Sequence, residues 1–223
     1  MTRRRWALLS EMVLLFAGGP FLLYYVVYER HVPLLIVLPF VLAVFLTLLV
    51  RQRDQNWRAD LVRAPEWRDV LSIFGVFLVC GGALTLFAFH RYPESFLTFP
   101  RFNRPLWLLV IVLYPLISVT TQELLYRVLF FHRYATAFNG ASSPAILVNA
   151  SLFASMHGIL FAYRGNPFHW EAVAISFIGG LLFAYRFTRT RSFLAVVLEH
   201  ALYGDLIFTI GLGRFFFTGV AHL

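Results

Sequence analysis

The sequence predicts an all-α, polytopic bundle of about seven membrane-spanning helices, and two observations support this fold class. Hydrophobic residues make up 60% of the 223 residues and charged residues only 13%, with a mean hydropathy of +0.73. A soluble domain contains roughly 45–50% apolar and about 25% charged residues. The second observation is that the apolar residues are gathered in separate windows long enough to cross a bilayer.

These windows follow one another along the whole chain. Each is about 16–24 residues long, close to the roughly 17–25 that a helix needs to cross the hydrocarbon core. We expect the first window to remain as a helix rather than to be cleaved as a signal peptide, because it is long and is followed by bulky and charged residues. The windows are 7–27, 33–50, 70–89, 106–129, 145–161, 172–187 and 193–212.

The basic residues predict the orientation. All 19 are arginine. With seven spans and a cytoplasmic N-terminus, twelve arginines fall in inner segments, among them Arg53 and Arg186. Six fall in outer segments, among them Arg164, and Arg127 remains inside a span. The positive-inside rule therefore favours a cytoplasmic N-terminus and an outside C-terminus. A missed or merged helix would reverse the C-terminal half.

The net charge of +8 is spread thinly along the chain. We expect it to face anionic lipid, since no basic run has the aromatic interleaving of a nucleic-acid site. The expected partners are therefore the lipid bilayer and a membrane-embedded or membrane-anchored peptide, and not a nucleic acid. The single Cys80 excludes an internal disulfide. The all-arginine composition suggests a GC-rich bacterium and thus its inner membrane. The inner loop at 51–69 is expected to hold a short interfacial helix.

A few ionisable residues lie well inside the predicted spans. Each costs roughly 2.5–3.5 kcal/mol there, so such residues are candidates for a functional site. Glu11 is better explained as the hydrogen-bond partner of a neighbouring group. The others fall in the fourth, fifth and seventh windows, and are Glu123, His157, Glu199, His200 and Asp205.

The spacing of these residues predicts that three helix faces meet. Glu123 and Arg127 are four apart, so they share a face and can pair. Asn149, Phe153 and His157 line one face of the fifth helix in the same way. Together with His200 and Asp205 of the seventh helix, they would form an intramembrane polar pocket between spans 4, 5 and 7. Such a set suits general acid–base activation of a water. The structural alternative is a buried ion pair and packing histidines.

Three motifs in this part of the chain resemble those of the CPBP intramembrane proteases, the family of the CAAX prenyl endopeptidases and bacteriocin-processing proteins. They are QELLYR (122–127), FASMH (153–157) and EHALYGD (199–205). The family pattern is Glu-Glu-x-x-x-Arg, then Phe-x-x-x-His, then a His followed four residues later by Asn or an acid. The similarity covers about residues 100–212. We therefore divide the chain into N-terminal helices (1–99) and a protease-like domain (100–223).

The resemblance implies a glutamic-type endopeptidase that uses no metal or other cofactor. The positions that activate the water correspond to Gln122 and His157, and the oxyanion-holding histidine corresponds to His200. Arg127 would pair with Glu123 and fix the helix. Two positions depart from the pattern, because the amide of Gln122 cannot act as a general base and Gly204 has no side chain.

Several functions remain open on the sequence alone. In an active protease, Glu123 would replace the missing base and act with His157, although it lies about 100° round the helix. His200 and an amide such as that of Asn149 would then hold the oxyanion. Alternatively, the fold has lost hydrolysis and binds a partner or a lipid. A proton-coupled transporter is a third reading, disfavoured by the lack of an inverted repeat. A zinc site of Glu123 and two histidines has suitable ligands but no His-Glu-x-x-His motif.

Overall fold

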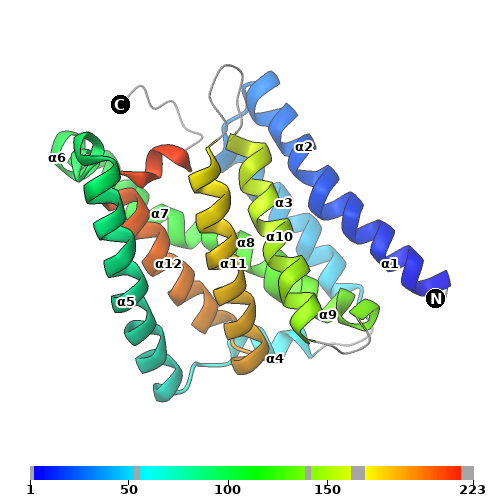
Figure 1. Cartoon of the computed structure of the whole chain (residues 1–223). Helices are drawn as coiled ribbons and strands as arrows, with labels where there is room; N and C mark the ends of the chain where they lie inside the picture. The colour runs from blue at the N-terminus through cyan, green and yellow to red at the C-terminus, as the bar shows by residue number, and fades with distance from the viewer. Residues whose placement is uncertain (1–2, 53–55, 139–141, 162–168, 217–223) are drawn as a thin grey trace.

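Helices account for every regular element that the structure describes. The computed structural model describes residues 3–52, 56–138, 142–161 and 169–216. The prediction of an all-α bundle is confirmed for these residues. Figure 1 shows α5, α12, α11 and α10 as successive neighbouring rods, with α1 and α2 at the edge away from α5.

The N-terminal part consists of one long helix, one shorter apolar helix and a short surface helix. Glu11 in the first helix accepts hydrogen bonds from Arg133 and Tyr134, which confirms its expected role as a neighbour's partner. The short helix α4 lies in the loop where an interfacial helix was predicted. The elements are α1 (Arg3–Val13), a π-helical turn (Leu14–Gly18), α2 (Gly19–Tyr24), a second π-helical turn (Tyr25–Glu29), α3 (Leu34–Val50) and α4 (Trp57–Val62).

The next segment begins with the long helix α5 (Trp67–Arg91). A capping box starts α5, because Glu66 and Asp69 each accept a backbone N–H of the other. A turn at Pro93–Ser95 and the short helix α6 (Thr98–Phe102) follow. Asn103 then caps α7 (Arg104–Leu113) by accepting the backbone N–H of Leu106.

Residues 104–138 form one continuous helical segment that is locally unwound at two places. After α7 come a π-helical turn (Tyr114–Val119), α8 (Thr120–Glu123), a second π-helical turn (Leu124–Leu129), α9 (Phe130–Tyr134) and a 3₁₀ turn (Ala135–Phe138). Pro115 lacks a backbone N–H and so cannot continue the regular α-helical ladder. Isolated π-helical turns are frequent at functional sites. Here they lie on both sides of α8, which carries Gln122 and Glu123.

The C-terminal half contains the helices at the centre of the bundle: α10 (Ser142–Phe161), α11 (Trp170–Thr190) and α12 (Phe193–Thr209). Gly180 lets α11 approach α10 closely, since an added Cβ would lie 3.0 Å from Cα of Ala150. Arg191 turns the chain with a left-handed backbone (φ 52°), and Ser192 caps α12. Because α12 packs against α8 and α11, and α11 packs against α10, the fourth, fifth and seventh predicted windows lie near one another.

The chain is an integral membrane protein by the length and apolarity of its helices. Four helical segments in the described residues are long and apolar enough to span a bilayer, at Arg3–Glu29, Trp67–Arg91, Arg104–Phe138 and Trp170–Thr190. They coincide with four of the seven predicted windows. Ile36–Val50 is a shorter apolar helix, and α10 and α12 occupy the remaining two windows. The count of seven spans therefore stays a prediction.

One arginine used to predict the orientation lies elsewhere than expected. Arg186 was assigned to an inner segment, but it is a buried residue of α11 that pairs with Glu199. Arg53 and Arg164, which also entered that comparison, lie outside the described residues. The cytoplasmic N-terminus stays a prediction.

Candidate active site

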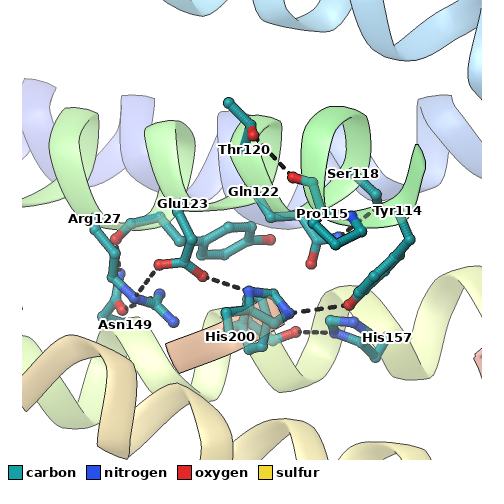
Figure 2. Close-up of polar contacts among 12 residues, drawn as sticks. Tyr114, Pro115, Ser118, Thr120, Gln122, Glu123, Arg127, Asn149, His157 and His200 are labelled. Atoms are coloured by element: carbon teal, nitrogen blue, oxygen red, sulfur yellow. Dashed lines mark hydrogen bonds and ion pairs between the residues drawn. The ribbon is translucent and has the colours of Figure 1, made fainter. Parts of the chain in front are cut away.

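Glu123 is the centre of a buried polar cluster between α8, α10 and α12 (Figure 2). Its Oε1 lies 2.7 Å from Nδ1 of His200, and its Oε2 lies 3.1 Å from Nε of Arg127. A carboxylate can only accept, so Nδ1 of His200 carries the hydrogen of this bond. The predicted pairing of Glu123 with Arg127 is therefore present, and a histidine from α12 completes it.

Arg127 is held by side chains of α10 and α11. Its Nη1 donates to Oδ1 of Asn149 at 2.8 Å, and its guanidinium carbon lies 5.0 Å and 5.7 Å from the ring centroids of Phe153 and Phe183. Cation–π contact of this kind stabilises a desolvated guanidinium. The amide nitrogen of Asn149 donates to the backbone oxygen of Tyr126 at 2.6 Å. Asn149 therefore links Arg127 to the backbone of Tyr126 and positions the guanidinium, while its suggested role as an oxyanion donor stays a prediction.

His200 links the carboxylate to a tyrosine. Its ring stacks on Phe183, with centroids 4.7 Å apart and planes 21° apart. Its Nε2 lies 3.1 Å from the hydroxyl of Tyr114. Since Nδ1 carries the hydrogen, Nε2 of the neutral ring accepts from this hydroxyl. The result is a chain from carboxylate to imidazole to phenol across α8, α12 and the π-helical turn at Tyr114–Val119.

His157 of α10 lies beside the same aromatic residue as His200. Its Nδ1 donates to the backbone oxygen of Phe153 at 2.9 Å, so Nε2 is the accepting nitrogen of the neutral ring. The ring centroid of Phe153 lies 4.7 Å from that of His157 and 5.7 Å from that of His200. The two histidines therefore meet around Phe153, as the three-face prediction required.

Gln122 extends from α8 toward the two histidines, as Glu123 does (Figure 2). Its amide nitrogen donates to Oγ of Ser118 at 2.8 Å. Its Oε1 is buried and has no hydrogen-bond partner in the part of the chain that the structure describes. Gln122 and Glu123 both lie on the side of α8 that faces the histidines, between the two π-helical turns.

Glu199 and Asp205 form no described hydrogen bond to this cluster. Glu199 forms a two-bond ion pair with Arg186 at 3.0 Å and 2.9 Å, and Arg186 also donates to Ser72. The backbone oxygen of Asp205 accepts from Thr209, and within the described ranges its buried Oδ1 has no hydrogen-bond partner. Of the predicted supporting residues, Gln122 and Asp205 are the two with no described hydrogen bond to Glu123, Arg127, Asn149 or the histidines.

Comparison with known proteins identifies the family of this segment. Residues 104–204 match the model of the Rce1-like family, described as type II CAAX prenyl endopeptidase Rce1-like. The match spans 101 of the 223 residues, and this segment is similar to that family. The match includes the first two motifs and the third as far as Gly204, and it confirms the resemblance to the CPBP proteases. No curated protein and no solved structure matches the chain.

Two parts of the Rce1-like segment were not predicted from the sequence. Tyr114, Ser118 and Gln122 are spaced four apart, a signal that could have placed the tyrosine on the face of the site. The ring of Tyr114 also fills the space beside Gly204, where an added Cβ would overlap it. The pairing of Glu199 with Arg186 had no local signal, because the two residues lie on different helices.

The polar cluster was also considered as a zinc site. No group of three or more His, Cys, Asp or Glu side chains in the described ranges is arranged to hold a metal ion. Glu123 contacts His200, whereas Nδ1 of His157 is directed to a backbone oxygen.

Proposed function

We propose that the chain is an intramembrane endopeptidase that hydrolyses a peptide bond of a membrane-embedded or membrane-anchored substrate. The Rce1-like segment supports the class of enzyme. The mechanism rests on one observation, the buried contact of 2.7 Å between Oε1 of Glu123 and Nδ1 of His200. It pairs a carboxylate with an imidazole whose other nitrogen can accept a proton.

In this mechanism His200 is the general base, and the carboxylate of Glu123 promotes its uptake of a proton. A carboxylate at Nδ1 fixes the tautomer and stabilises the imidazolium that forms when Nε2 takes a proton. Nε2 removes a proton from water, the water oxygen attacks the scissile carbonyl carbon, and the carbonyl becomes an oxyanion. The imidazolium then returns the proton to the amide nitrogen as the C–N bond breaks. The reaction is of glutamic type because the charge of Glu123 promotes the proton uptake.

This assignment differs from the one considered from the sequence, in which Glu123 acts with His157 while His200 holds the oxyanion. Nε2 of a neutral His200 is an acceptor and cannot donate to an oxyanion before it has taken a proton. We assign His157 to orienting the attacking water instead. Arg127, Asn149 and Phe153 position Glu123 in this scheme.

The proposal also covers the domain division of the enzyme, its orientation and the membrane that holds it. Residues 100–223 form the protease domain and residues 1–99 supply additional membrane helices. The N-terminus is cytoplasmic, and the membrane is a bacterial inner membrane.

A cleavage assay on the purified protein in liposomes tests the proposed function. The probes are a fluorogenic peptide with a prenylated CAAX terminus and a fluorogenic single-span peptide without a prenyl group. We expect cleavage of at least one probe, and a loss of about 10²–10⁴-fold in Glu123→Ala and His157→Ala, the usual worth of general acid–base groups. Absence of cleavage of both probes, or an unchanged rate in Glu123→Ala, contradicts the proposal.

The controls separate the other functions. His90→Ala changes an exposed histidine at the end of α5 and should leave the rate unchanged. A strong chelator should also have no effect, whereas a zinc enzyme would stop. A proton-coupled transporter would show pH-driven flux into the liposomes with neither probe cleaved.

A further inference from the structure

Tyr114 and Gly204 fit together at the accepting nitrogen of His200. The hydroxyl of Tyr114 lies 3.1 Å from Nε2, and its ring lies where any side chain at position 204 would begin. The ring also packs edge-on against Phe208, with centroids 5.1 Å apart. Gly204 and Phe208, one turn apart on α12, therefore hold the hydroxyl at Nε2.

This position matters because Nε2 is where the proposed reaction takes place. A water that gives its proton to Nε2 must lie within hydrogen-bond distance of that nitrogen. The carbonyl carbon that this water attacks then lies about 3–3.5 Å from the water oxygen, and the carbonyl oxygen is bonded to that carbon. The hydroxyl of Tyr114 already lies at this point, and its hydrogen can rotate about the Cζ–O bond.

We propose that the hydroxyl of Tyr114 is the hydrogen-bond donor that stabilises the oxyanion of the tetrahedral intermediate. This role rests on the proposed function. In the resting enzyme the hydroxyl donates to Nε2 of His200. When water and substrate are bound, the water takes that acceptor and the hydroxyl hydrogen turns to the substrate oxygen. The donor keeps its proton throughout, so only the water, Nε2 and the amide nitrogen exchange protons.

The ring of Tyr114 explains why position 204 is glycine, and no second hydrogen-bond donor is needed at that position. With any larger residue there, the ring of Tyr114 must move and the hydroxyl must leave Nε2. Gly204 is thus a positioning residue that acts through Tyr114. Its substitution should reproduce the loss of the hydroxyl and should add little to it.

Steady-state kinetics with the probe that the wild-type protein cleaves test this role. Tyr114→Phe removes only the hydroxyl and should lower kcat about 10²–10³-fold, as loss of one oxyanion donor does elsewhere, with KM changed by less than about threefold. Gly204→Ala should lower kcat similarly, and the double variant should be no slower than Tyr114→Phe by more than about threefold, since the two changes remove one interaction. Thermal unfolding of each variant checks that it folds.

The matched control is Tyr203→Phe. Tyr203 also packs near Phe183, and its buried hydroxyl lies beside Cys80, with no described hydrogen bond to Glu123 or to either histidine. It should keep the wild-type kcat. The role of Tyr114 is wrong if Tyr114→Phe keeps a kcat within threefold of wild type while Glu123→Ala is inactive. That result leaves the proposed function intact. If the wild-type protein cleaves neither probe, the proposed function and this role are both wrong.

Discussion

Glu123 is engaged on both carboxylate oxygens, and this determines how it can take part in a reaction. Oε1 accepts from His200 and Oε2 faces Arg127, while the side chain is completely buried. In the proposed mechanism the influence of Glu123 on the water passes through His200, which its Oε1 contacts. The same burial makes the ion pair important for folding, because removal of one partner of a buried pair costs about 3–5 kcal/mol.

The side chain of Gln122 provides a second prediction about a single residue. An amide cannot take a proton, and its Oε1 makes no described hydrogen bond, so Gln122→Ala should keep the single-turnover rate within about threefold. The lost bond to Ser118 should cost about 1 kcal/mol of stability. The measurement is the cleavage rate together with thermal unfolding. A loss of hundredfold or more would mean that Gln122, and not the Glu123–His200 pair, is central to the reaction.

The sequence predicted the contacts within helices better than those between helices. The spacing of Glu123 and Arg127 was sufficient for their pairing, because residues four apart share a helix face. It could not show which histidine meets Glu123. That choice depends on how α10 and α12 pack against α8, and on the π-helical turns around α8. Apart from Pro115, those turns have no clear local signal.

At the scale of whole elements, the contact of α10 with α11 depends on small residues. Gly180→Ala would bring a Cβ to 3.0 Å from Cα of Ala150, and the backbone there cannot move aside cheaply. We expect a loss of about 1–3 kcal/mol of stability. Gly75→Ala in α5 is the matched control, since its Cβ would meet nothing within 4 Å. Equal unfolding temperatures for the two variants would show that this packing is not tight.

The ion pair between Arg186 and Glu199 joins α11 to α12 and should be structural. Glu199→Ala leaves a buried arginine without its partner, so we expect a loss of about 3–5 kcal/mol. Arg186→Met with Glu199→Leu removes both charges and should be clearly more stable than Glu199→Ala alone. The rate of cleavage per folded molecule should stay near wild type in both variants. A large fall in that rate with unchanged stability would instead place Glu199 in the chemistry.

For the molecule as a whole, composition was enough to predict an all-α membrane protein, because apolar windows of spanning length have few other uses. It was less informative about the helix count and the loops. Arg186 was predicted to be a loop residue because it lies near the end of a window, where a long basic side chain can reach the membrane interface. Here it instead reaches the buried acid Glu199. A single sequence does not distinguish these two cases.

The orientation can be tested with engineered cysteines in a Cys80→Ser background. Arg4, Arg58 and Arg104 are exposed, and each is replaced by Cys in turn. We expect an impermeant maleimide to label position 104 in intact spheroplasts, and positions 4 and 58 only after permeabilisation, because arginine-rich segments face the cytoplasm. Labelling of position 4 in intact cells would reverse the predicted topology.

The most direct test of the central claim is the single-turnover cleavage rate of Glu123→Gln. This variant keeps the size of the side chain but removes the charge that stabilises the imidazolium of His200. The rate should fall about 10²–10⁴-fold. The rate of His200→Gln, in which Glu123 still faces Arg127, should fall to the same level. This second variant shows whether the loss in Glu123→Gln comes from a folding defect specific to that change. A rate for folded Glu123→Gln within threefold of wild type would contradict the claim that Glu123 drives water activation through His200.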